Sequence, residues 1–258
     1  MAPLLVNLLI SFLLFVALLI ALEVGRRIGK RKKVDKDGLG TGASDGVVFA
    51  VFGLIAAFTF STATSRFNDR RELIVEQANA LGTAHLRLDA LDPADRTEIR
   101  QHMLHWVELS QRYRDVVSDS ARLSELVAEG DREQAEVWRL AGTAVEKKNQ
   151  PALWSFVMSP LNDWIDLTTK RNAVSDLGTP TTVLVTLIAL SLVTATLAGF
   201  NSSPKPRSRL HTFAFAGIIA LLVFVMLDMK SARSGLIRVD SLDHILEQVG
   251  QGIRAQLQ

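Results

Sequence analysis

The second of four long apolar stretches in this chain continues well past the length that a membrane can hold. From Gly46 the residues VVFAVFGLIAAFTFSTA carry no charge, and the chain then runs on without a proline until Pro93. A helix from Gly46 to Leu91 would be roughly 70 Å long at about 1.5 Å per residue. Only about 30 Å of that length fits the hydrocarbon core of a bilayer. We therefore expect one continuous helix that joins a membrane region to a water-exposed region, an organisation typical of a pore with a vestibule or of a sensor with a stalk.

The four apolar stretches predict an all-α protein with four transmembrane helices. The chain is 258 residues long and 48% hydrophobic, and each stretch is free of Asp, Glu, Lys and Arg. This meets the length and composition criteria for a spanning helix. The stretches are Pro3–Leu22, Gly46–Thr62, Pro180–Phe200 and His211–Leu227.

The order of these stretches predicts four parts of the chain. Residues 1–62 would hold the first two transmembrane helices and a basic loop, and residues 63–178 an extramembrane helical bundle continuous with the second helix. Residues 179–230 would hold the last two transmembrane helices, and residues 231–258 a C-terminal tail.

Basic residues between the stretches predict the orientation. Ten of them lie in the two short loops after the first and third stretches, and none lies in the short N-terminal flank. Short cytoplasmic loops are enriched in Lys and Arg. The sequence therefore predicts a multi-pass protein of the bacterial inner (plasma) membrane, with the N-terminus and the central bundle on the outer side. The basic loops are also typical of segments that bind the headgroups of anionic membrane lipids.

In the central region, residues recur at the three- and four-residue spacing of one helix face, and we call each such row a seam. One seam begins at Phe67 and a second at Ile99, and the two are separated by Asp92 and Pro93, an N-cap and first-turn pair that starts a helix. An antiparallel hairpin joined at Asp92 is the simplest arrangement. We expect helix breaks at Gly130 and at 149–151. The seams are Phe67, Ile74, Ala78, Leu81, His85 and Leu88; Ile99, Met103, Trp106, Ser110, Tyr113 and Val117; Val137, Trp138, Ala141 and Val145; and Leu153, Val157, Leu161, Trp164 and Thr168.

The chain carries few signs of catalytic or metal chemistry. It has no cysteine, and neither a nucleophile elbow nor a phosphate-binding loop occurs. Glu98, His102 and His105 share a helix face at metal-ligand spacing, but a solvated face is the favoured interpretation. We expect no enzyme activity, no cofactor and no metal. The net charge of +2 gives no reason to expect nucleic-acid binding.

One face of the second stretch is a candidate pore lining. Ala50, Leu54 and Phe58 recur every four residues, so in an oligomer they would form stacked apolar rings, a hydrophobic neck that gates by dewetting. Ordinary packing within one protomer is the alternative.

Three arginines follow this candidate neck. Arg66, Arg70 and Arg71 would attract anions at the pore mouth. Pairing with Asp69, Glu72 or Glu76 at helical spacing is the competing interpretation.

Two motifs resemble a known family. The stretch from Phe52 to Phe58 with Arg66–Phe67 and Asp69–Arg71 resembles the second membrane helix of bestrophins, and Phe58–Leu91 with Leu227–Val239 resembles the bacterial bestrophin-like membrane proteins, a family distantly similar to bestrophin anion channels. That resemblance implies a homo-oligomer, a pentamer if the assembly follows bestrophins. It further implies a helical vestibule, chloride or other small anions as the conducted species, and Ala50, Leu54 and Phe58 at the pore neck.

The sequence departs from bestrophins in two respects. Thr59-Phe60-Ser61 replaces an Arg-Asn-Asn after the neck, and the charge pattern places the N-terminus outside where bestrophins begin in the cytoplasm. A non-conducting envelope sensor or scaffold with a helical stalk is the alternative function.

Overall fold

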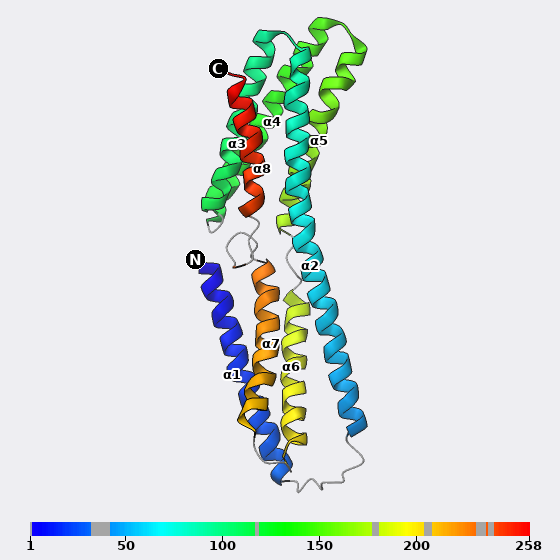
Figure 1. Ribbon diagram of the computed structural model, residues 1–258, viewed down its shortest axis with the longest axis vertical. Coiled ribbons are helices and arrows are strands. Elements are labelled where there is room, and N and C mark those ends of the chain that lie inside the picture. Colours follow the sequence, from blue (N-terminus) through cyan, green and yellow to red (C-terminus); the bar gives the residue numbers. More distant parts are fainter. Residues whose placement is uncertain are drawn as a thin grey trace. The chain divides into compact units, whose positions relative to one another are not determined.

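The computed structural model describes residues 2–31, 42–116, 119–176, 181–203, 208–230, 236 and 240–258. These residues form helices joined by short connections, with no strand among them (Figure 1). The all-α fold expected from the sequence is confirmed. The helices are α1 (Ala2–Arg31), α2 (Gly42–Arg87), the short 3-10 helix η1 (Leu88–Ala90), α3 (Pro93–Val116), α4 (Ser120–Lys148), α5 (Pro151–Asp176), α6 (Thr181–Asn201), α7 (Arg209–Lys230) and α8 (Asp240–Ala255).

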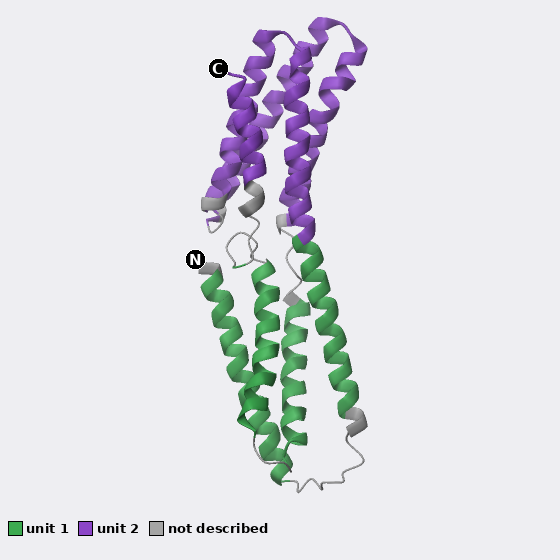
Figure 2. Ribbon diagram, viewed as in Figure 1, with its two compact units in different colours: residues 1–67, 178–237 green, residues 68–177, 238–258 purple. Residues whose placement is uncertain are grey.

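The helices divide into two compact units (Figure 2). Unit 1 consists of residues 1–67 and 178–237, and unit 2 of residues 68–177 and 238–258. Helix α2 contributes to both, because its 46 residues run from Gly42 to Arg87 as one α-helix. No proline interrupts this stretch, so every residue after the first turn can donate its backbone N–H along the helix.

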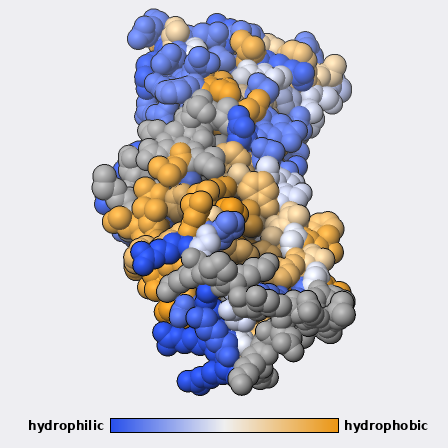
Figure 3. All heavy atoms as spheres, turned by 60° about the horizontal axis from the view of Figure 1, so that its bottom comes forward, coloured by the Kyte–Doolittle hydropathy of each residue, from blue (hydrophilic) through white to orange (hydrophobic). Residues whose placement is uncertain are grey.

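Unit 1 contains four helices that are long and apolar enough to cross a membrane. They cover Leu4–Arg31, the apolar part of Asp45–Ala90, Thr182–Asn201 and Arg209–Met229. Hydrophobic residues gather over their outer surface, and hydrophilic residues lie at the end of the unit that is turned forward in Figure 3. All four helices supply side chains to one core: Leu14, Leu18, Ala56, Ala63, Leu187, Ala195, Ala216, Ile219, Val223, Met226 and Leu227.

Helices α1 and α6 pack backbone against backbone in unit 1. A Cβ added to Gly25 of α1 would lie 2.8 Å from the carbonyl carbon of Thr196 on α6, and one added to Gly29 would lie 2.8 Å from the Phe200 carbonyl oxygen. Gly199 meets the carbonyl of Leu22 in the same way. Gly25 and Gly29 form a small-xxx-small pair, which lets two helix backbones approach closely in a membrane.

Polar contacts tie the ends of the unit 1 helices together. Asn201 Nδ2 at the end of α6 donates a 2.7 Å hydrogen bond to Oδ2 of Asp45, which is buried in the first turn of α2. Near the C-terminal end of α7, both carboxylate oxygens of Asp228 accept a hydrogen bond from the backbone N–H of Leu236 at 2.9 Å. These bonds satisfy two carboxylates that the protein buries, as buried charges require.

Unit 2 is a bundle built on the predicted seams. The first two seams are buried at every position that the structure describes, and Val117 lies outside the described residues. Helix α3 begins at Pro93, where proline costs nothing because the first N–H of a helix has no helical partner. At the centre Trp106 of α3 and Trp164 of α5 meet edge to face with their ring centroids 5.0 Å apart.

The expected break at Gly130 is wrong, because α4 runs through it from Ser120 to Lys148. The missing side chain of Gly130 leaves room for Tyr113 and Trp106 of α3 to pack against α4. A Cβ at this position would lie 2.6 Å from the Tyr113 hydroxyl and 3.4 Å from Trp106 Nε1. The break at 149–151 is confirmed, since Asn149 ends α4 in the left-handed conformation at φ 49°. Trp138, expected in the seam, is 37% exposed, while its neighbour Val137 is buried.

The C-terminal tail forms a helix that packs on unit 2. Leu246 and Ile253 of α8 are buried, and Gly250 packs against Val107 of α3 so closely that a Cβ would lie 2.9 Å from a Val107 methyl. Arg254 adds a 2.7 Å ion pair with Glu108. An amphipathic helix that buries one apolar face in this way gains stability from packing more than from helix propensity.

Candidate functional site

The candidate neck residues lie on a face of α2 that is uncovered within the single chain. Leu54 is 57% exposed and Phe58 is 65% exposed, and Ala50 is exposed on the same side. Ser61 and Ser65 continue this face and are also exposed. We name these five residues, Ala50, Leu54, Phe58, Ser61 and Ser65, the α2 strip.

The opposite face of α2 packs into unit 1. Ala56, Thr59 and Ala63 are buried there, and the first and last of them belong to the core shared with α6 and α7. Thr59 donates its hydroxyl to the carbonyl of Ile55 at 2.7 Å, so this buried polar group is satisfied. Helix α2 therefore has one face packed within its own protomer and one face that is exposed in the single chain.

The three candidate mouth arginines follow the α2 strip along α2, with Arg66 in unit 1 and Arg70 and Arg71 in unit 2. Arg66 and Arg70 are half-buried and Arg71 is exposed. All three interact with other groups of the protein. Asp69 lies between the first two of them, Glu72 and Glu76 follow the last, and all three carboxylates are exposed. Three positive and three negative formal charges thus cancel between residues 66 and 76.

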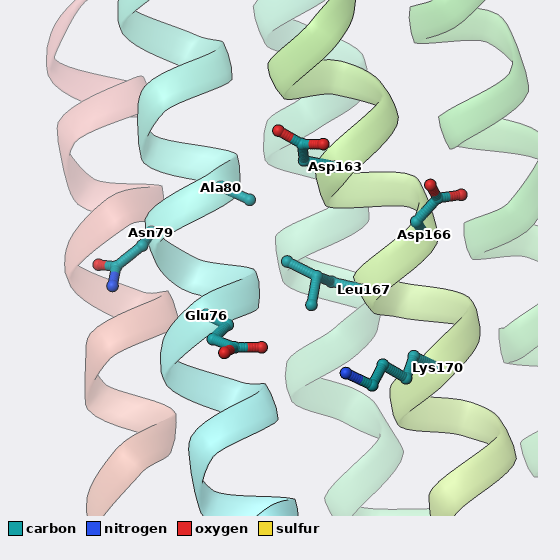
Figure 4. A pocket seen from close by; sticks show the side chains of 7 residues that line it. All are labelled: Glu76, Asn79, Ala80, Asp163, Asp166, Leu167 and Lys170. Carbon is teal, nitrogen blue, oxygen red and sulfur yellow. The ribbon is translucent and has the colours of Figure 1, made fainter.

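An open groove of about 460 Å³ lies between α2 and α5 in unit 2 (Figure 4). Glu76, Asp163 and Asp166 line it together with one cation, Lys170. Asp166 accepts a 2.8 Å hydrogen bond from Asn162. Because carboxylates outnumber the cation on its walls, this groove does not attract anions.

The three residues with metal-ligand spacing do not come together. His102 and His105 contact Glu133 of α4 in place of Glu98, with their Nδ1 atoms 2.7 and 3.0 Å from its two carboxylate oxygens. No group of three or more His, Asp or Glu side chains within the described parts of the chain is arranged to hold a metal ion. The contact joins α3 to α4.

A buried polar network that sequence reasoning missed lies at the centre of unit 2. The Thr168 hydroxyl accepts hydrogen bonds from the side-chain amides of Gln77 at 2.6 Å and Gln134 at 2.8 Å, and it donates to the Trp164 carbonyl at 2.9 Å. Arg171 donates to the Gln77 carbonyl oxygen. One hydroxyl thereby links α2, α4 and α5 with its donor and acceptor capacity filled.

A second polar cluster fixes the turn between α2 and α3. Arg100 is buried and donates to Asp89 at 2.8 Å and to Nδ1 of His85 at 3.4 Å. Burial, and then the charge of Arg100, lower the pKa of His85 to about 4 from its usual 6.5. The hydrogen bond from Arg100 lowers the pKa of Asp89 as well. His85 is therefore neutral at physiological pH and serves as an acceptor.

Comparisons with known proteins agree with this architecture. Among solved structures, a variant of a bacterial bestrophin homologue from Klebsiella pneumoniae matches with a TM-score of 0.68 at 15% identity, over 94% of this chain and 96% of that one. A second variant of that homologue matches with a TM-score of 0.68 at 14% identity, over 95% and 99%. A structure described as a membrane protein matches with a TM-score of 0.67 at 13% identity, over 95% and 98%.

Identities this low establish the fold alone. No curated protein matches the chain. A sequence profile of the bestrophin-like domain, however, matches residues 9–242, which is nearly the whole length. The resemblance of the two sequence motifs is thereby confirmed, and the protein belongs to the bestrophin-like family.

Proposed function

We propose that this protein forms an oligomeric channel for small anions in the bacterial inner membrane, with the α2 strip lining its axis. The observation that carries the proposal is the exposure of Leu54 and Phe58 on a transmembrane helix whose opposite face is already packed. Large apolar side chains on such a face need a covering of lipid, of another protomer or of a narrow pore.

The composition of the α2 strip favours a pore over lipid. It begins with Ala50, Leu54 and Phe58 and ends with the hydroxyls of Ser61 and Ser65. Lipid-facing surfaces rarely carry polar groups, because each group loses its hydrogen bonds with water. An apolar constriction followed by hydroxyls instead matches a dewetting neck that opens into a hydrated region.

Membership of the bestrophin-like family supports anions as the conducted species. Arg71, exposed six residues after the last residue of the strip, supplies positive potential. The exposed carboxylates Asp69 and Glu72 oppose it, so ion preference depends on which of these charges face the axis. The reversal potential of the current in a chloride gradient measures that preference.

Planar-bilayer recording of the purified protein tests conduction. Phe58→Ala widens the neck and is expected to raise single-channel current. Phe60→Ala is the matched control, since Phe60 lies on the same helix but about 200° away around its axis at 3.6 residues per turn and is only 37% exposed. A larger current from Phe58→Ala alone supports the neck, and equal effects of the two substitutions contradict it.

The assembly state is tested separately by native mass spectrometry of the detergent-solubilised protein. We propose a homo-pentamer, in keeping with the family resemblance. A monomer would contradict any pore that several copies of α2 must line. An intact oligomer in which both the wild type and Phe58→Ala are silent would favour a non-conducting sensor or scaffold.

A further inference from the structure

Helix α1 carries a row of exposed aliphatic side chains along one side. Leu9, Leu13, Val16, Ile20 and Val24 recur every three or four residues, and all five are exposed. We name them the α1 aliphatic strip. At about 100° per residue they occupy one sector of the helix, as 3.6 residues per turn requires.

Two arginines follow the α1 aliphatic strip towards the C-terminal end of α1. Arg27 and Arg31 lie three and seven residues after Val24, on the same side of the helix, and both are exposed. The Arg27 side chain is 74% exposed and pairs with Glu23 at 3.1 Å. Glu23 is the one acidic residue in the sequence of α1, and an ion pair this exposed is weak. A competing anion can therefore take its place.

Packing of α1 on α6 fixes which way these arginines face. Gly25 and Gly29 lie against the backbone of α6. Arg27 and Arg31 each stand two residues beyond one of these glycines, about 200° around the helix. Their guanidinium groups are thus directed away from α6, while the aliphatic strip leads up to them.

We propose that this side of α1 binds an anionic phospholipid of the bilayer, with an acyl chain along the α1 aliphatic strip and the phosphate at Arg27 and Arg31. A guanidinium pairs well with phosphate because its donors match two oxygens at once. The apolar strip and the cationic pair together match the two chemical parts of a phospholipid. Arg209, exposed at the start of α7, adds positive charge to this part of unit 1. Conduction is not needed for this inference.

Native mass spectrometry of the full-length protein tests the site with phosphatidylglycerol and phosphatidylcholine of identical acyl chains. The wild type is expected to retain phosphatidylglycerol preferentially. Arg27→Gln combined with Arg31→Gln is expected to weaken this binding about thirtyfold, given the usual contribution of each basic residue near an anionic surface. Arg27→Lys with Arg31→Lys keeps the charges and is expected to retain most of the binding.

The matched control removes two exposed arginines of unit 2, Arg122→Gln with Arg132→Gln, and is expected to leave retention unchanged. Equal retention of the two lipids by the wild type, or an equal loss in the control, would overturn the proposal. Inorganic phosphate is added as a competitor in the same experiment. If it displaces phosphatidylglycerol at equal concentration, the arginines bind phosphate alone and the aliphatic strip has no part in recognition.

Discussion

Gly199 of α6 lies against the carbonyl group of Leu22 on α1, where an added Cβ would come within 2.8 Å of the carbonyl carbon. Gly25 of α1 meets the Thr196 carbonyl in the reciprocal way. In both places the obstacle is backbone, which cannot rotate aside as a side chain can. The crossing of α1 and α6 therefore depends on glycine from both helices.

Replacing either glycine at this crossing is expected to destabilise unit 1. Gly199→Ala forces the two backbones apart and should cost about 1–3 kcal/mol, the usual effect of overpacking. Thermal unfolding in detergent measures it. Gly53→Ala is the matched control, because nothing lies within 4 Å of the added Cβ and alanine favours a helix. A similar loss from both variants would contradict the packing explanation.

The Thr168 hydroxyl predicts a large effect of one small change in unit 2. Thr168→Val keeps the shape but removes the acceptor for Gln77 and Gln134, and leaving buried amides unpaired costs about 1–3 kcal/mol each. All four tryptophans, Trp106, Trp138, Trp154 and Trp164, belong to unit 2, so their fluorescence during denaturation reports its unfolding. Thr169→Val, at an exposed neighbour, should be close to neutral. Thr168→Ser should keep most of the stability, and an equal loss in the Ser and Val variants would contradict a role for the hydroxyl.

His85 predicts how the stability of unit 2 depends on pH. Its pKa is about 4 in the folded protein and 6.5 ordinarily, so between these values the unfolded chain binds more protons. The free energy of unfolding therefore falls as the pH falls from about 6.5 towards 4, by at most about 3 kcal/mol. Tryptophan-detected denaturation at several pH values measures the slope.

A substitution at His85 isolates its share of that slope. His85→Asn keeps an acceptor for Arg100 and should flatten the dependence between pH 6.5 and 4. His244→Asn, at an exposed position of α8, should leave it unchanged. An unaltered slope in His85→Asn would assign the proton uptake to other groups.

Sidedness can be measured with single cysteines, because the sequence contains none. We expect Ser124→Cys in unit 2 to react with a membrane-impermeant maleimide in intact cells, as the positive-inside rule predicts. Ser208→Cys, at the start of α7, should react only after the cells are opened. Both serines are exposed. The reverse pattern would place unit 2 in the cytoplasm.

The sequence predicted most of the helices because their signals are local. Uncharged stretches and the regular spacing of residues such as Leu81 and Ile99 depend only on neighbours along the chain. The start of α3 at Pro93 follows from the same kind of information. The error at Gly130 has the opposite cause. The reason for a glycine there is the distant Tyr113, which sequence spacing does not show.

Features that depend on partners far apart in the chain were missed. Gln77, Gln134 and Thr168 form one network, yet each alone looks like an ordinary polar residue of a helix. Helix α8 had a readable signal in the apolar positions Leu246, Val249 and Ile253, four or so residues apart. The pore neck and mouth remain predictions, because the residues around an oligomer axis are set by contacts between protomers.

The two units are interleaved along the chain, which sets the order in which each can be completed during synthesis. Unit 1 begins with α1, but its core waits for α6 and α7 until the main part of unit 2 has been made. Unit 2 in turn lacks α8, which is synthesised after α6 and α7, so Val107 on α3 stays uncovered until then. Membrane insertion and folding of the bundle must therefore overlap in time. A nascent chain stalled before α8 would expose apolar surface of α3 to chaperones.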